Sequence, residues 1–193
     1  SLLDPGAWFR RDGNGQKSNA SGCGNDLATE DPDIRALLLH TVAHWFSSYH
    51  IDGLRLDLAE LIDDQTLAEI TDVALELRPD ALLIAEPWSF RGRRPEAISE
   101  LGYTVWNDDY RNVIKGRQPH EAGFVFGGQA NAGVRASLAG STVHDGGRLA
   151  ASELSLNYLA CHDDHTFGDF VRLALGLVGG GDTVSKSSIR AVP

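Results

Sequence analysis

The stretch IDGLRLDLAE, residues 51–60, reads as a short buried strand that carries charged residues at its end. Arg55 and Asp57 are two residues apart, and in a strand this spacing places both side chains on the same face. Ionised groups are costly to bury unless they are paired. We therefore expect Arg55 to bind Asp57, holding that carboxylate ionised and oriented. Such a pair is more often structural than catalytic, so other residues must decide its role.

Helix and strand patterns alternate on both sides of this stretch. Apolar spacing predicts helices over residues 31–50, 64–77, 108–115 and 167–175, and short apolar runs predict strands over 53–57, 81–85, 103–106 and 154–159. The first helix has Asp31 as its expected N-cap, followed by proline. Residues 1–28 and 118–147 are rich in loop-forming residues. The alternation favours an α/β fold with a parallel sheet.

Acidic residues follow three of the predicted strands. Asp57 ends the first, Glu86 follows the second, and Asp163 lies beyond the last. The carboxyl ends of parallel strands meet around one pocket, so we expect these carboxylates to lie together. Two carboxylates across a pocket suit glycoside cleavage, one as nucleophile and one as protonated general acid. Glu86 follows the apolar run ALLIA (81–85), which we expect to be a strand buried on both faces. This apolar setting favours the protonated form of Glu86.

Other polar and aromatic residues are candidates for binding a sugar or a metal ion. Trp88, two residues beyond Glu86, offers a flat face on which a sugar ring can stack. The run HDDH at 162–165 resembles a metal cluster, but no second group at ligand spacing supports it. His40 and His44 lack the glutamate that a zinc protease helix carries between its histidines. We therefore expect neither a metal nor a cofactor.

Composition restricts the partners and the compartment. The chain has 193 residues and a formal charge of −10, which argues against nucleic acid or an anionic membrane as the main partner. Nothing approaches the roughly 18 continuous apolar residues that span a membrane. The two cysteines, Cys23 and Cys161, could pair, but we expect two free thiols in a reducing compartment, which favours the cytoplasm. Secretion of a full-length protein stays an open alternative.

Three stretches together resemble the short motifs of the alpha-amylase family of glycoside hydrolases, in the same order. They are DGLRLDLAE (52–60), LLIAEPW (82–88) and NYLACHDD (157–164). The resemblance implies that Asp57 is the nucleophile, with Arg55 as its partner, and that Glu86 is the proton donor. It also implies that Asp163 is the third catalytic carboxylate. Asp163 and His162 would bind sugar hydroxyls and stabilise the transition state.

Two further stretches resemble the debranching branch of that family, the pullulanases, isoamylases and glycogen debranching enzymes. They are residues 18–53 and VWNDDYRNVIKG (105–116). The resemblance implies that Asn25 lines the cleft. It places Trp106, Asn107 and Asp108 near the substrate at the next strand end.

The implied activity is retaining hydrolysis of α-1,6 links in starch-type or glycogen-type α-glucans. Two alternatives stay open: an α-1,4 hydrolase or transferase of the same family, and a non-catalytic glucan-binding relative. Comparing hydrolysis of linear amylose with hydrolysis of pullulan separates the first alternative from debranching. Glucan binding without formation of a product would indicate the second alternative.

The implied fold is a partial (β/α)₈ barrel, from before its fourth strand to after its seventh. Residues 1–175 would form the partial catalytic domain and residues 176–193 a loose tail. The family's first motif, an aspartate and a histidine after an early strand, is missing, and the sequence contains no methionine. We therefore expect a piece of a longer reading frame. Half a barrel exposes strand edges, so the isolated chain should be weakly stable, prone to self-association, and weakly active or inactive.

Overall fold

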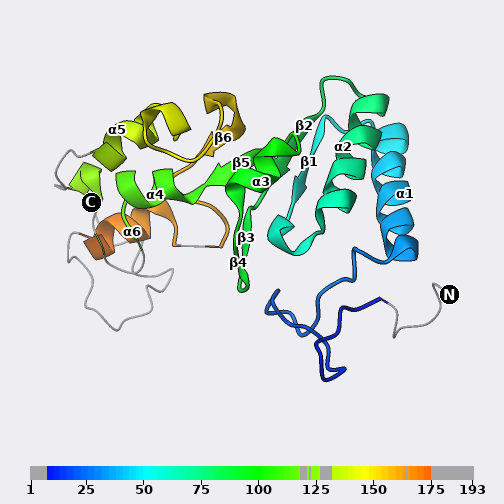
Figure 1. Ribbon diagram of the computed structural model, residues 1–193. Helices are drawn as coiled ribbons and strands as arrows, with labels where there is room; N and C mark the ends of the chain where they lie inside the picture. The colour runs from blue at the N-terminus through cyan, green and yellow to red at the C-terminus, as the bar shows by residue number, and fades with distance from the viewer. Residues whose placement is uncertain (1–7, 118–120, 122, 127–131, 164, 175–193) are drawn as a thin grey trace. The chain divides into compact units, whose positions relative to one another are not determined.

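Helices alternate with parallel strands along the chain, which confirms the predicted α/β class (Figure 1). The computed structural model describes residues 8–117, 121, 123–126, 132–163 and 165–174. The chain divides into two units, Ser1–Trp106 and Asn107–Pro193, called unit 1 and unit 2 below. The predicted loose tail at 176–193 lies outside the described residues. No helix in the described part of the chain is both long and apolar enough to span a membrane.

Unit 1 contains the elements that carry the first two predicted carboxylates. In chain order they are α1 (Pro32–Tyr49), β1 (Gly53–Leu56), the 3₁₀ turn η1 (Ala59–Leu61), α2 (Asp64–Leu77), β2 (Leu82–Ala85), β3 (Trp88–Ser89), β4 (Gly92–Arg93), α3 (Pro95–Glu100) and β5 (Thr104–Asn107), of which Asn107 already belongs to unit 2. The four predicted segments before residue 100 and the strand after it are confirmed. The hairpin β3–β4 and the helix α3 were not predicted.

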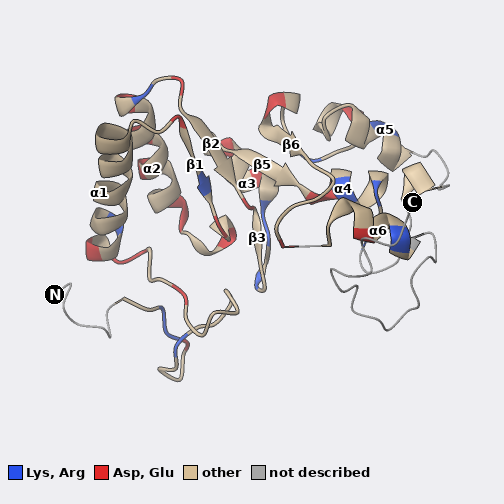
Figure 2. Cartoon of the chain, turned by 180° about the vertical axis from the view of Figure 1, so that it is seen from behind, with Lys and Arg blue, Asp and Glu red and all other residues tan. Residues whose placement is uncertain are grey.

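The sheet of unit 1 is parallel, with β2 between β1 and β5. Gly53 pairs with Leu82, and the register continues to Leu56 opposite Ala85. The two strands therefore end side by side. Asp57 is the residue that follows β1, and Glu86 is the residue that follows β2. Arg55 is the one charged residue of β1, β2 and β5. Figure 2 shows a basic position within β1.

The helices α1 and α2 lie side by side next to β1 and β2 (Figure 1). The Asp31 carboxylate caps α1 by accepting from the amides of Asp33 and Ile34, as expected. From the predicted apolar face of α1, Ile34, Val42 and Phe46 are buried. Trp45, placed on that face by its spacing, instead stays 45% exposed.

The buried Tyr103, which directly precedes β5, links this strand to helix α2. Its hydroxyl donates to the carbonyl of Leu67 at 2.9 Å, and its side chain is fully enclosed. Burial raises the pKa of Tyr103 to about 12, so the phenol stays neutral over the whole physiological range.

Two expectations about burial and loops are corrected. The run ALLIA was expected to be buried on both faces, but Leu82 is 55% exposed and burial begins at Leu83. Leu82 opens the strand opposite Gly53, which has no side chain to cover it. The loop-rich segment 118–147 contains a helix over Ala132–Leu138, which its many glycines and alanines concealed.

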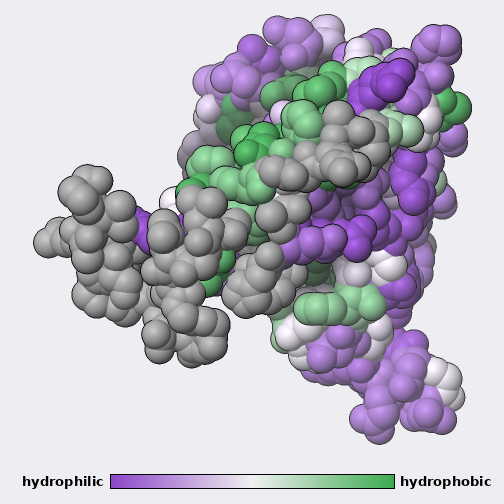
Figure 3. Space-filling view, turned by 90° about the vertical axis from the view of Figure 1, so that its left-hand side faces the viewer, coloured by the Kyte–Doolittle hydropathy of each residue, from purple (hydrophilic) through white to green (hydrophobic). Residues whose placement is uncertain are grey.

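Unit 2 is built mainly of short helices. They are α4 (Asp108–Ile114), η2 (Phe124–Phe126), α5 (Ala132–Leu138), η3 (Val143–Asp145), η4 (Ser152–Leu154) and α6 (Phe167–Ala174), with one short strand, β6 (Ser155–Asn157). The predicted helices at 108–115 and 167–175 are confirmed, and the predicted strand at 154–159 is shorter than expected. Leu138 and Val143 are 63% and 65% exposed. Figure 3 shows hydrophobic patches on the face of the molecule that it draws. Exposed apolar patches can mediate association between molecules, and the expected self-association stays a prediction.

The pairing of β1 with β2 depends on Gly53, because a Cβ atom there would lie 2.1 Å from the carbonyl oxygen of Leu82. We predict that Gly53→Ala forces the strands apart and lowers the free energy of unfolding by about 1–3 kcal/mol. Gly13→Ala is the matched control, since a Cβ at Gly13 meets nothing within 4 Å. Urea unfolding of both variants would check this, and equal midpoints would contradict it.

Candidate active site

The Arg55 guanidinium lies between the two predicted catalytic carboxylates of unit 1. Its Nη1 donates to Asp57 Oδ1, which confirms the expected pair. Its Nη2 lies 3.3 Å from Glu86 Oε2, an ion pair without hydrogen-bond geometry. The same guanidinium stacks 4.8 Å from the centroid of the Trp106 ring. One cation from β1 therefore contacts both carboxylates and one predicted aromatic residue.

The surroundings of Glu86 differ from the expectation. The residue is 2% exposed, as expected for a residue that directly follows a buried apolar strand. Its Oε2, however, accepts from the amide of Leu58 at 2.9 Å and faces Arg55. The expected apolar setting is therefore wrong on this side of the carboxyl group, where a cation and an N–H donor both interact best with the ionised form.

The chain turns sharply after Asp57, and Leu58 adopts a left-handed conformation with φ of 45°. A left-handed backbone costs a residue with a Cβ atom on the order of 1–2 kcal/mol, so surrounding contacts must hold it. The turn gives two consecutive amides to one residue. Leu58 donates to the Glu86 side chain, and Ala59 donates to the Glu86 carbonyl at 2.8 Å. Sequence reasoning missed these amides, because backbone donors leave no signal in residue type.

The two predicted aromatic residues of unit 1 lie near each other. The Trp88 and Trp106 rings are 6.5 Å apart between centroids and inclined by 61°, an edge-to-face contact. Both residues are half-buried, so each keeps a part of its surface open. Because Trp106 also stacks on Arg55, the aromatic pair adjoins the carboxylate pair. This arrangement supplies apolar ring surface beside acidic groups, as sugar binding requires.

Asp57 also borders a cleft of about 260 Å³ that lies within unit 1. The Asp57 side chain is 65% exposed, in contrast to the buried Glu86. The opposite wall comes from the loop before α1 and includes Ser21, Cys23 and Asn25. Asn25 and Asp57 therefore line one cleft, and the predicted role of Asn25 in the substrate cleft stays a prediction.

The buried Asp26 organises the loop that carries Asn25. Its carboxylate accepts from the hydroxyl of Ser18 and from the amides of Ala20 and Ser21, the last two at 2.9 and 2.8 Å. Burial by itself raises the pKa of Asp26, but these hydrogen bonds outweigh it, and the net pKa lies below its ordinary value. The loop shape on this side of the cleft thus depends on an ionised Asp26.

In unit 2, Asn107 is committed to structural contacts. Its amide nitrogen lies 2.6 Å from Ser141 Oγ and 2.8 Å from Ser155 Oγ, and its oxygen caps α4 by accepting from the Tyr110 amide at 2.9 Å. The residue is 6% exposed. Its predicted contact with substrate, and that of Asp108 in the first turn of α4, stay predictions.

The residues of the third motif are exposed in unit 2. His162 Nε2 lies 3.2 Å from Asp163 Oδ1, and the two side chains are 62% and 59% exposed. Cys161 brings its sulfur within 4.8 Å of their ligand atoms. Exposed groups of this kind are common without an ion, and the expected lack of a metal stays a prediction. So does the expected meeting of Asp163 with Asp57 and Glu86.

Comparison with known proteins confirms the predicted resemblance. The chain is 33% identical over 187 residues to a pullulanase of Bacillus subtilis (strain 168), covering 89% of this chain and 26% of that protein. It is 28% identical over 179 residues to a glycogen debranching enzyme of Yersinia pestis bv. Antiqua (strain Angola), covering 88% of this chain and 26% of the relative. No protein-family model matches the chain.

Solved structures give the same result. The pullulanase from Paenibacillus barengoltzii in complex with maltohexaose and alpha-cyclodextrin superposes with a TM-score of 0.84 at 30% identity, over 97% of this chain and 31% of that one. A pullulanase from Anoxybacillus sp. LM18-11 complexed with maltotetraose gives 0.80 at 28% identity, over 91% of this chain and 27% of that one. The chain therefore spans about a quarter of the length of the curated relatives that it matches.

The lowered pKa of Asp26 predicts a specific loss of stability in acid. Stability from its hydrogen bonds is fully present above the unfolded pKa and is lost as the pH falls through the lower folded value. We expect the unfolding free energy of wild type to fall more steeply than that of Asp26→Asn below about pH 4. Urea unfolding at a series of pH values measures the difference. Parallel curves for the two proteins would contradict the role given to this carboxylate.

Proposed function

Because the chain is homologous to pullulanases and glycogen debranching enzymes, we propose that it carries the catalytic carboxylates of a debranching glycoside hydrolase. The substrate class is a branched α-glucan, cleaved at its α-1,6 links. The observation that carries the proposal is the pair formed by Asp57 and Glu86, which follow adjacent parallel strands and share Arg55. The maltooligosaccharides named in the solved complexes of similar proteins support the substrate class.

The proposal includes a partial (β/α)₈ barrel, from before its fourth strand to after its seventh. Two observations support it. The parallel strands β1, β2 and β5 lie side by side in the sheet in the order in which they occur along the chain, with helix α2 between the first two and α3 between the last two, as in a barrel wall. The superposition on pullulanases covers nearly the whole chain but under a third of theirs.

The proposed reaction is a double displacement. In the first step the protonated Glu86 gives its proton to the bridging oxygen, while Asp57 attacks the anomeric carbon and the glycosidic bond breaks. A covalent glycosyl-enzyme forms, and the severed glucan leaves with the proton. In the second step the ionised Glu86 removes a proton from water, which attacks the same carbon and releases Asp57. The sugar leaves with retained configuration, and Glu86 is again protonated.

The contacts observed around Glu86 fit the ionised state that it takes between the two steps. Between the steps this residue is an anion, and the Leu58 amide and Arg55 interact favourably with that anion. Asp57 is more exposed and faces the cleft, as a nucleophile must. In unit 2, Asp163 and His162 are assigned to sugar hydroxyls, gripped more tightly as the ring flattens toward the transition state.

Removing either carboxylate should abolish turnover without unfolding the protein. We predict that Asp57→Asn and Glu86→Gln, made in the protein at its encoded length, each lower kcat on pullulan roughly a thousandfold or more. Asp52→Asn is the matched control, because the Asp52 side chain is 85% exposed and forms an ion pair with Arg78, away from the carboxylate pair. Reducing-end release from pullulan and from amylose measures both the loss and the linkage. Normal activity of Asp57→Asn would end this assignment, and cleavage of amylose alone would indicate an α-1,4 enzyme.

The stereochemistry gives a second test. A retaining pair requires the Asp57 and Glu86 carboxyl groups to lie ~5–5.5 Å apart, whereas an inverting pair lies ~6.5–9.5 Å apart with water between. We expect proton NMR of early hydrolysis products to show the α-anomer first, before mutarotation. Initial appearance of the β-anomer would exclude the double displacement.

A further inference from the structure

Three consecutive backbone carbonyls in the turn after Asp57 each accept a hydrogen bond from a different arginine. Arg91 Nη2 donates to the carbonyl of Glu60 at 2.8 Å. Arg10 Nη2 donates to that of Leu61 at 3.1 Å, and Arg94 Nη2 to that of Ile62 at 2.5 Å. We call Arg10, Arg91 and Arg94 the arginine cluster.

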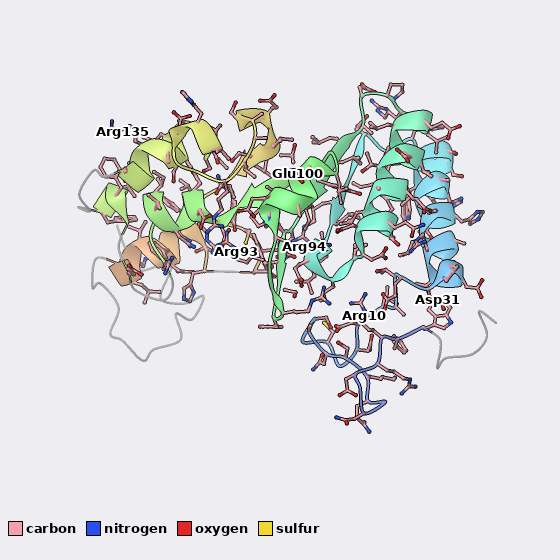
Figure 4. All side chains as sticks on the ribbon, in the orientation of Figure 1. Arg10, Asp31, Arg93, Arg94, Glu100 and Arg135 are labelled. Carbon is pink, nitrogen blue, oxygen red and sulfur yellow. The ribbon has the colours of Figure 1, made fainter. Side chains whose placement is uncertain are left out.

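The arginine cluster is gathered from two distant parts of unit 1. Arg10 comes from the N-terminal loop, Arg91 from the hairpin between β3 and β4, and Arg94 from the start of α3. Figure 4 shows Arg10 and Arg94 approaching the turn from these different elements. Together the three line a cavity of about 420 Å³ on the turn. The turn is therefore fixed by long-range contacts.

Each arginine is also paired with an acid, so the cluster adds little net charge. Arg10 Nε lies 2.9 Å from Glu30 Oε1, and Arg94 Nη1 binds Asp64. Arg91 Nε lies 3.0 Å from Oε1 of the buried Glu60, whose Oε2 also accepts from the Ser89 hydroxyl. With the charge neutralised in each pair, what the cluster supplies is directional donors aimed at the main chain.

The fixed turn is the one that presents two amides to Glu86. Leu58 at its start is left-handed, and inside it the Leu61 amide donates to the Leu58 carbonyl at 2.8 Å. A strained residue keeps its conformation only where neighbouring contacts over-determine it. The carbonyls of residues 60–62 provide such contacts two to four positions further along the chain.

We propose that Arg10, Arg91 and Arg94 are positioning residues for the hydrolytic reaction. They hold the turn at 58–62 so that the Leu58 and Ala59 amides face Glu86 while Asp57 faces the cleft. The inference rests on the proposed function for its catalytic consequence, although the turn geometry itself stands apart from it. None of the three is assigned a contact with substrate.

The first test measures the turn directly. In the 193-residue chain, amide hydrogen exchange at Leu58 and Ala59 should become about tenfold faster in Arg91→Gln. The Arg91 side chain is half exposed, so we expect this variant to keep its fold. Arg11→Gln is the matched control, because Arg11 is exposed and its guanidinium donates to the carbonyl of Gly15 in its own loop. Unchanged exchange at both amides would overturn the inference.

The second test measures catalysis in the protein at its encoded length. We expect Arg91→Gln and Arg94→Gln to lower kcat on pullulan about tenfold while KM stays within about threefold, since a displaced turn affects the reacting groups more than binding. Arg94→Lys, which keeps one donor, should recover part of the loss, and Arg11→Gln should match wild type. A rise in KM alone, or a loss explained by unfolding in thermal melts, would overturn the inference.

The two tests separate this inference from the proposed function. Wild-type turnover of pullulan with unchanged kcat in both variants would overturn the positioning role alone. A wild-type protein that cleaves no α-glucan would overturn the proposed function and the catalytic half of this inference with it. Faster exchange in Arg91→Gln would then still show that the cluster fixes the turn.

Discussion

The parallel pairing of β1 with β2 is the constraint on which the candidate site depends. It places Leu56 opposite Ala85, so Asp57 and Glu86 leave the sheet together and Arg55 can reach both. A slip of one residue would turn the Arg55 side chain to the other face of the sheet. The close approach of Gly53 to Leu82 makes that slip costly, because a residue with a side chain cannot take the place of Gly53. The acidic pair is thus a product of strand register.

From this pairing the two carboxylates acquire different surroundings. Asp57 is largely exposed at the cleft, whereas Glu86 is buried. In the turn after Asp57, one amide donates to the Glu86 side chain and the next donates to the Glu86 carbonyl. Two groups of one chemical type can take different roles when their environments differ, which is the usual basis of acid and nucleophile assignments. In unit 1 the difference arises from the sharp turn at Leu58, more than from the sequence around each acid.

Local signals in the sequence were enough for the helices α1, α2, α4 and α6, for the parallel strands β1, β2 and β5, and for the Arg55–Asp57 pair, but not for β3, β4, α3 or α5. The Asp31-Pro32 cap, the apolar spacing of α2 and the two-residue offset of Arg55 each act within a few residues, so the sequence predicts them. The polar side of the Glu86 environment and the arginine cluster were missed, since they depend on contacts between residues some 28 to 51 positions apart. Asn107 differs in another way. The family resemblance predicts that it contacts substrate, but its observed hydrogen bonds are to other residues of the protein.

The contacts described above that set the geometry of Asp57 and Glu86 come from residues 10–106, within unit 1. The two carboxylates and the residues that support them therefore form one connected set of contacts within unit 1. A substitution among the supporting residues disturbs several carbonyls and amides together, so its effect extends beyond the residue that is changed.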